Sequence, residues 1–343
     1  MTGEEELPER MAYFPGCMIS TQEYGYEMSL RELFPKFGVE LVDTEGFSCC
    51  GTPIRHLNLN VSLYLGLRNI AVAEAEGLDV FAPCPMCHLS LVEAKNTVDK
   101  NPELLNQMNQ TLLGEELEYK GTARILHTLD VLASKMDVIK EQTEKPVGKL
   151  VAAHYGCHTI RYSDLERPDH PESPHKIEDV LDAVGCLTKG YAERLNCCGG
   201  PWLANQVDSA LTKTGEKLKA ISEQGFDGVC HVCPWGHRMM DNRQQDAATT
   251  VAAQFEVPVF YLTQLVGYAL GLEPEKLGLM LNSSPVEKIV EGLVEPTPEG
   301  SGEDQVESTP DDSAMTPAHE ASSPQEDTDD TEDSSNSTEG GDA

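Results

Sequence analysis

Short apolar runs and longer amphipathic stretches follow one another along this chain. Short runs that end close to a cysteine lie at residues 11–14, 78–84, 149–154 and 226–230. Runs of this length, bounded by turn-forming residues, are typical of buried strands. Residues 61–77 and 207–225 carry apolar positions at helical spacing instead, and the first of them ends at Gly77, a residue that commonly follows a helix.

The predicted elements occur in the same order in both halves of the chain. Residues 38–46 form a further strand of the first half, and each half closes with a strand that leads into a packing helix, at 125–133 and 259–271. Alternation of strand and helix favours parallel sheets with helical crossovers. We therefore predict an α/β fold of two tandem repeated domains, with functional groups at the carboxyl ends of their strands.

The composition changes near Glu295. From there to the end the chain has 16 Asp and Glu, no Lys or Arg, and many Ser, Thr, Pro and Gly residues. Such a segment buries too little apolar surface to offset the entropy of ordering it. We predict a disordered acidic tail over 295–343, preceded by two domains over 1–145 and 146–294.

The whole chain is acidic, with 58 Asp and Glu against 25 Lys and Arg. This charge disfavours binding to nucleic acid or to an anionic membrane surface. No run approaches the roughly 20 apolar residues that span a bilayer, and the start MTGEEELPER lacks the features of a signal peptide. We expect a cytoplasmic protein, with a peripheral place on a membrane complex also open, that binds no nucleic acid and has no membrane span.

Ten of the eleven cysteines follow one five-point pattern twice. The intervals are C-x31-CC-x33-C-x2-C in the first half and C-x39-CC-x31-C-x2-C in the second, and only Cys186 falls outside them. In a reducing compartment, so many cysteines indicate metal or redox chemistry. Zinc and a cubane iron–sulfur cluster each take four thiolates, so a fifth is either a spare buried thiol or a ligand of an unusual cluster.

This double pattern resembles the cysteine-rich domains in the B subunit of heterodisulfide reductase. The resemblance covers about residues 11–272, including AYFPGC, GVELVDTEGFSCCG and HYGCH. It implies a non-cubane 4Fe–4S cluster in each repeat, held by all five cysteines of that repeat. The first set would be Cys17, Cys49, Cys50, Cys84 and Cys87, and the second Cys157, Cys197, Cys198, Cys230 and Cys233.

The resemblance also implies a function. The chain would be the catalytic subunit of an oxidoreductase acting on sulfur groups, which reduces or forms a disulfide of small thiols between the two clusters. His158 matches the position of the family's proposed proton donor, and the alternative is that it only hydrogen-bonds nearby backbone. The chain lacks a ferredoxin motif and a dinucleotide-binding loop, so its electrons would come from a small ferredoxin-like iron–sulfur subunit and a flavoprotein.

Two other functions remain open at this point. The chain could be an electron-transfer subunit of a quinone-linked succinate dehydrogenase or fumarate reductase, or of another dehydrogenase complex. It could also be a zinc-stabilised interaction module, although the surplus cysteines disfavour zinc.

Several further residues lie near the cysteines. The histidines could donate hydrogen bonds to cluster sulfur or be ordinary buried polar residues, and the arginines could meet an anionic substrate or be solubilising charge. These residues are His88, His154, His231, His237, Arg55 and Arg161. Cys186 is expected to be a buried thiol.

Overall fold

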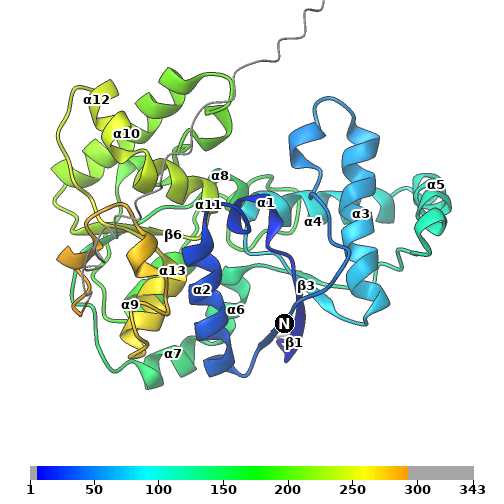
Figure 1. Ribbon diagram of the computed structural model, residues 1–343, viewed down its shortest axis with the longest axis horizontal. Helices are drawn as coiled ribbons and strands as arrows, with labels where there is room; N and C mark the ends of the chain where they lie inside the picture. The colour runs from blue at the N-terminus through cyan, green and yellow to red at the C-terminus, as the bar shows by residue number, and fades with distance from the viewer. Residues whose placement is uncertain (1–5, 293–343) are drawn as a thin grey trace, which may run out of the picture. The chain divides into compact units, whose positions relative to one another are not determined.

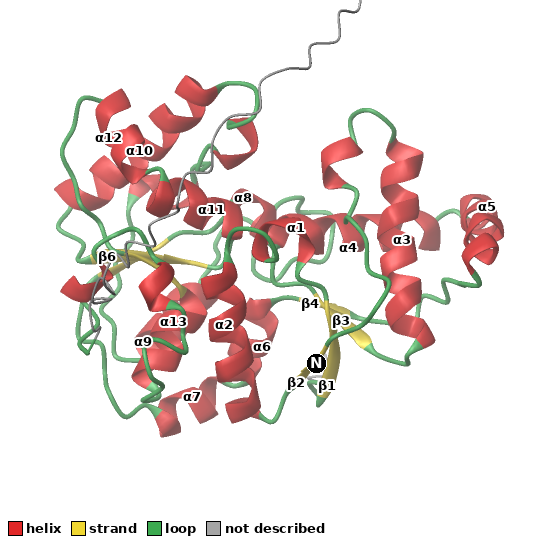
Figure 2. Cartoon of the chain, viewed as in Figure 1, coloured by secondary structure: helices red, strands yellow, loops and turns green. Residues whose placement is uncertain are grey.

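Two parallel sheets organise the computed structural model, which describes residues 6–292. The predicted tail over 295–343 lies outside the described residues. The first sheet has the order β2-β1-β3-β4, formed by β1 (Arg10–Tyr13), β2 (Glu40–Val42), β3 (Asp79–Phe81) and β4 (Ile125–Leu126). The second has the order β5-β6-β7, formed by β5 (Val151–Ala153), β6 (Gly228–His231) and β7 (Val259–Tyr261). Figure 2 shows the two sheets as separate groups of strands.

The two sheets share one connectivity. β1 pairs with both β2 and β3, and β5 pairs with β6, all in parallel register. An isolated parallel bridge between Leu150 and Leu187 lies in the position that β2 takes in the first sheet. The α/β prediction with tandem repeats is therefore confirmed, because every strand expected from the apolar runs is present.

Helices surround both sheets (Figure 1). Those of the first half are α1 (Gly16–Ile19), α2 (Tyr24–Leu33), α3 (Leu59–Ala75), α4 (Pro85–Asp99), α5 (Pro102–Leu112), α6 (Thr128–Ser134) and α7 (Met136–Gln142). Those of the second half are α8 (Cys157–Ile160), α9 (Lys176–Ala183), α10 (Val207–Glu223), α11 (Pro234–His237), α12 (Gln244–Thr250) and α13 (Leu262–Ala269). None of these helices between residues 6 and 292 is both long and apolar enough to span a membrane.

One hydrophobic cluster spans the two halves, and two smaller clusters lie within the second half. Helix α2 lies beside α13, as Figure 1 shows, and α1 contacts α11. One continuous cluster of buried apolar side chains includes Met11 and Phe81 from the first half and Phe260 and Leu265 from the second. The helices that follow β1, β3, β5 and β6 contact one another across the two halves, α1 with α11 and α4 with α8, which places the cysteine loops of both halves close to the interface.

Candidate metal centre

The first set of cysteines gathers from three strand ends. Cys17 lies in α1 just after β1, and Cys49 and Cys50 lie in the loop that follows β2. Cys84 precedes α4 as its N-cap residue, and Cys87 lies in the first turn of that helix. The prediction that these residues follow the carboxyl ends of parallel strands holds for all five.

Hydrogen bonds and charges link these five thiols. Hydrogen bonds from the thiols of Cys49 and Cys87 hold the pKa of Cys50 well below its usual value. Cys87 also interacts with Cys84, while burial together with the charges of Cys50 and Cys84 raises the pKa of Cys17. The neighbouring thiols therefore favour the ionised form of Cys50 within the first set.

The second set shows the same pattern with four members. Hydrogen bonds from Cys157 and Cys198 hold the pKa of Cys197 well below its usual value. The pKa of Cys198 is raised by its hydrogen bond to Cys197, by burial and by the charge of Cys233. Cys157, Cys197, Cys198 and Cys233 therefore form one cluster of thiols.

Cys230 does not join that cluster, so the structure does not bring together all five cysteines expected in the second set. Cys230 lies within β6, where it pairs with Ala153 and Phe260, and its side chain is wholly buried. Burial and the charge of Cys186 both raise the pKa of Cys230. The residue in the same register of the first sheet is Phe81, which pairs with Tyr13 as Cys230 pairs with Ala153.

Two glycines allow the paired cysteines to turn sharply. Gly51 and Gly199 follow the Cys-Cys pairs with φ angles of 90° and 86°. A Cβ atom on Gly51 would lie 2.6 Å from the carbonyl oxygen of Ser62, and one on Gly199 would lie 2.4 Å from that of Ala210. Only glycine fits, because both the left-handed backbone and the close backbone contact exclude a side chain.

Gly199→Ala should therefore destabilise the fold by about 2 kcal/mol or more, the sum of left-handed strain and a backbone clash. The measurement is the free energy of unfolding in denaturant. Gly77→Ala is the matched control, because Gly77 also has a positive φ of 69° but a Cβ atom added there would have no heavy atom within 4 Å. Equal losses in the two variants would show that the contact with Ala210 contributes nothing.

Tyr26 lies where the two sets of cysteines approach each other. Its Oη atom lies 3.2 Å from the carbonyl oxygen of Val232, 3.5 Å from that of Pro83 and 2.8 Å from Oγ1 of Thr128. Pro83 and Val232 directly precede Cys84 and Cys233. Burial and the charges of these two cysteines raise the pKa of Tyr26. Burial and the charge of Cys84 raise the pKa of Cys233. One buried hydroxyl therefore ties together the equivalent loops of both halves.

The ring of Tyr26 belongs to a buried stack of aromatic side chains. Tyr26 stacks on Tyr261 with ring centroids 4.1 Å apart, and Tyr261 stacks on His237 at 4.2 Å. Glu23 accepts a hydrogen bond from Tyr261 Oη at 2.7 Å and lies 3.0 Å from Nδ1 of His237. This arrangement fixes the interface between the halves beside Cys233.

His158 lies against both halves of the molecule. Its Nδ1 atom is 3.4 Å from Sγ of Cys157, and its carbonyl oxygen accepts a hydrogen bond from Arg167. Arg167 also contacts Nδ1 of His88 in α4 at 3.4 Å. Burial lowers the pKa of His158 and outweighs the opposite effect of the charge on Cys197.

A small cavity of about 80 Å³ opens beside His158. Its lining includes Thr52, whose Oγ1 atom lies 3.3 Å from Sγ of Cys50, and the exposed side chain of Tyr162. Arg55 also lines it but is already paired with Glu93, with Nε 2.8 Å from a carboxylate oxygen. The cavity is therefore lined by one residue hydrogen-bonded to the first set, Thr52, and by one hydrogen-bonded to the second set, His158.

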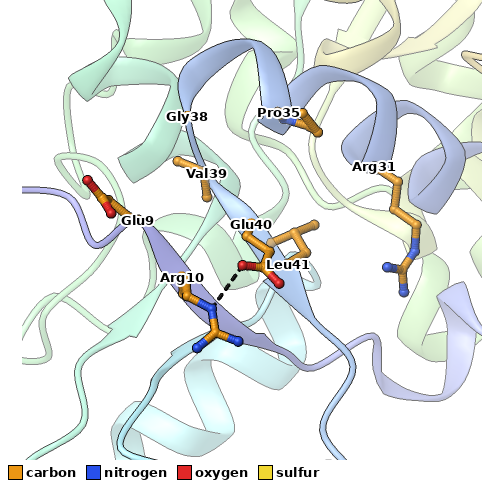
Figure 3. Close-up of a pocket in the computed structure, with 8 residues that line it drawn as sticks. All are labelled: Glu9, Arg10, Arg31, Pro35, Gly38, Val39, Glu40 and Leu41. Atoms are coloured by element: carbon orange, nitrogen blue, oxygen red, sulfur yellow. Dashed lines mark hydrogen bonds and ion pairs between the residues drawn. The ribbon is translucent and has the colours of Figure 1, made fainter.

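A larger cavity of about 500 Å³ lies away from the cysteines. Figure 3 shows it at the amino ends of β1 and β2, where Arg10 forms an ion pair with Glu40 at 2.9 Å. Arg31 lines it from α2. Since the cysteines follow the opposite ends of these strands, this cavity is not part of the candidate site.

The histidines near the cysteines have different surroundings. Both ring nitrogens of His88 have partners, Arg167 and the carbonyl oxygen of Ile125 at 3.2 Å, so this side chain is not available to donate to sulfur. Nδ1 of His154 lies 2.9 Å from Nζ of Lys217, while its Nε2 is buried without a partner. Neither ring nitrogen of the buried His231 has a partner among the described residues. Arg161 is exposed, and Cys186 is buried as predicted.

The chemistry of the donors fits an iron–sulfur cluster. Thiolates are the ligands of such clusters, and the thiols of each set lie within reach of one another. Gly16 keeps the backbone close to Cys87, since a Cβ atom there would lie 2.6 Å from its sulfur. Among residues 6–292, no three His, Cys, Asp or Glu side chains are placed to hold a single metal ion.

The cysteine-rich CCG domain matches this chain twice, at residues 11–92 and 151–241. The chain therefore belongs to the family of proteins with tandem cysteine-rich CCG domains. The matches coincide with the two groups of cysteine-bearing strand ends described above.

Two of the similar proteins match this chain over most of its length. An 8-methylmenaquinol:fumarate reductase membrane anchor subunit from Wolinella succinogenes is 31% identical over 80% of this chain and 97% of its own length. The B subunit of the ferredoxin/F(420)H(2)-dependent CoB-CoM heterodisulfide reductase of Methanosarcina acetivorans is 29% identical over 80% of this chain and 93% of its own length. The resemblance to the B subunit of heterodisulfide reductase is therefore confirmed.

A solved structure supports the fold alone. The crystal structure of a hypothetical protein from Helicobacter pylori superposes with a TM-score of 0.65 at 18% sequence identity. The similarity covers 81% of this chain and 52% of the other, so this chain spans about half the length of that protein.

Proposed function

We propose that this chain is the iron–sulfur catalytic subunit of a heterodisulfide-reductase-like complex, which reduces or forms a disulfide of small thiols. The observation that carries this proposal is the cavity beside His158. Thr52 and His158 both line this cavity. Thr52 is hydrogen-bonded to Cys50 of the first set, and His158 is hydrogen-bonded to Cys157 of the second. A disulfide bound there would have one set of cysteines on either side.

The ligands we propose differ between the two sets. Cys17, Cys49, Cys50, Cys84 and Cys87 would hold a non-cubane 4Fe–4S cluster, and Cys157, Cys197, Cys198 and Cys233 would hold the second cluster. A pair of such clusters supplies the two electrons that disulfide reduction consumes. Because the ligands must be thiolates, binding releases protons from the hydrogen-bonded thiols that remain protonated in the metal-free chain.

His158 would supply a proton to the released thiolate. Because Cys157 would be a thiolate, Nδ1 of His158 would donate to its sulfur, so His158 would give up a proton from Nε2 in its imidazolium form, into the cavity that it lines. Arg167 would hold the imidazole in place through its bond to the His158 carbonyl oxygen. The role of Arg167 is positioning, because it bridges to His88 in the other half.

The cavity suits only the sulfur-bearing end of a substrate. Its volume of about 80 Å³ is filled by a few heavy atoms, so the rest of a thiol would extend past Tyr162 into solvent. Electrons would come from a small ferredoxin-like iron–sulfur subunit and a flavoprotein, in keeping with relatives that are named as subunits.

A quinone-linked electron relay is the second candidate function. It is favoured by the similarity to the fumarate reductase anchor subunit and by the separation of Cys230 from the second set, which makes the two sets unequal. In this function the chain would pass electrons between partner subunits without a disulfide substrate of its own.

Reoxidation of the reduced protein separates the two functions. The protein is reduced anaerobically with a one-electron donor, and the return of its visible absorbance is followed after adding a panel of small disulfides or a soluble quinone. The proposal predicts rapid reoxidation by at least one disulfide. Reoxidation by the quinone alone, with clusters intact, would favour the relay.

A further inference from the structure

Three positions around the second set of cysteines differ from their counterparts around the first. The strand register gives the correspondence: the N–H of Phe14 donates to the carbonyl oxygen of Phe81 at 2.9 Å, and the N–H of His154 donates to that of Cys230 at 2.9 Å. His154 thus corresponds to Phe14. The residues that follow β3 and β6 correspond in the same way.

Cys233 is the counterpart of Cys84, not of Cys87. Each is the N-cap residue of a helix that begins with proline, Pro85 in α4 and Pro234 in α11. Three residues further along, Cys87 in the first helix therefore corresponds to Gly236 in the second. The fifth thiol of the first set has no counterpart in the second.

His154 lies beside the position that corresponds to that fifth thiol. A Cβ atom on Gly236 would lie 3.7 Å from Cδ2 of His154 and 3.6 Å from Cβ of Cys233. Cδ2 is bonded to Nε2, the ring nitrogen that is buried without a partner. A polar nitrogen therefore stands next to the position at which the first set has a sulfur.

Lys217 determines which His154 nitrogen carries hydrogen. Nζ of Lys217 donates to the carbonyl oxygens of Glu193 and Asn196 at 2.7 Å each and contacts Nδ1 of His154 at 2.9 Å. Burial lowers the pKa of Lys217 only to about 8, so at neutral pH it is mainly an ammonium group, whose three hydrogens serve these three contacts. Nδ1 then accepts, which leaves Nε2 of the neutral imidazole as an N–H donor.

The first set has no such cation at the equivalent position. Lys217 is the eleventh residue of α10, and the eleventh residue of the equally long α3 is Asn69. Asn69 donates to the carbonyl oxygen of Cys49 at 3.1 Å, so it supports the cysteine loop without carrying charge. Phe14, the counterpart of His154, packs edge-on against Phe47.

We infer that the second set is a four-thiolate iron–sulfur site in which the Lys217–His154 pair replaces the fifth cysteine. This inference rests on the proposed iron–sulfur function and deepens it. The potential of a cluster rises when its net charge is less negative and when N–H groups donate to its sulfur. The second cluster has one thiolate fewer, a neighbouring cation and an available N–H donor, so it accepts an electron at a more positive potential than the first.

Iron content tests the ligand set. Cys233→Ala should lose about half of the iron, the share of one of two four-iron clusters. Cys230→Ala is the matched control, because Cys230 belongs to the same Cys-x2-Cys motif but its thiol lies within strand β6. This variant should keep all of the iron. Circular dichroism checks the fold of both variants, and Cys157→Ala serves as a second ligand variant if Cys233→Ala does not fold.

Redox titration tests the order of potentials. Paramagnetic resonance at controlled potential should show two reduction waves in the wild type, and Cys233→Ala should remove the more positive one. Lys217→Asn, which installs the residue of the first set, should shift that wave alone to a more negative potential. Lys219→Asn on the exposed face of the same helix should leave both waves in place.

The outcomes separate this inference from the proposed function. Equal loss of iron in Cys230→Ala and Cys233→Ala would overturn the four-thiolate site while leaving an iron–sulfur protein. Loss of the more negative wave in Cys233→Ala, or a wave unmoved by Lys217→Asn, would overturn the order of potentials. Wild-type protein without iron would overturn both the inference and the function on which it rests.

Discussion

Replacing Cys84 and Cys87 together by Ser should remove about half of the iron bound by the wild type, the share of one of two four-iron clusters. Both thiols belong to the first set, where Cys87 interacts with Cys50 and with Cys84. Serine keeps the size of each side chain but is a poor ligand for iron in such clusters. The second set is untouched, so its iron should remain. The measurement is iron and sulfide content after anaerobic purification.

Cys186→Ser is the control for this experiment. Cys186 is also a buried free thiol but lies in neither set, and its substitution should leave the iron content unchanged. Loss of all iron from the double variant would mean that the two sites do not fill independently. Unchanged iron would remove Cys84 and Cys87 from the ligands.

Replacing His158 by Ala should slow disulfide reduction by roughly 10²-fold or more, the usual contribution of a general acid. The clusters should remain, because every cysteine is intact. The assay is anaerobic reduction of a disulfide by an artificial one-electron donor, with wild type and variant compared at equal iron content.

His158→Gln refines this test. Glutamine retains a polar side chain of similar reach but cannot act as an acid, so it should be as slow as the alanine variant if proton donation is the role of His158. A Gln variant with the wild-type rate would mean that His158 only supports the cavity wall beside Cys157.

The strands and long helices could be predicted because their signals are local. Runs such as 78–84 and 207–225 gave β3 and α10, and the order of elements was enough to predict two parallel sheets. The convergence of most cysteines followed from the same reasoning, since the carboxyl ends of parallel strands share one edge of a sheet.

The cysteine cluster of the second half could not be predicted by counting cysteines. The spacing C-x2-C occurs in both halves, but in the second half its first cysteine lies inside β6 and interacts with Cys186. Aligning Pro85 and His88 with Pro234 and His237, rather than cysteine with cysteine, would have shown the shift.

Contacts between segments that are far apart in the chain also could not be predicted from the sequence. Tyr26 reaches Val232 across 206 residues, and Lys217 reaches His154 across 63. Neither residue belongs to a recognisable motif, because each acts through packing of segments that are far apart in the chain. Arg167, which joins His158 to His88, escaped the sequence reasoning for the same reason.

Iron and acid-labile sulfide in the anaerobically purified wild-type chain test the central claim most directly. Two four-iron clusters predict about eight iron atoms and a similar amount of sulfide per chain, with broad visible absorbance that bleaches on reduction. A chain that binds zinc without sulfide, or that contains no metal, would contradict the account.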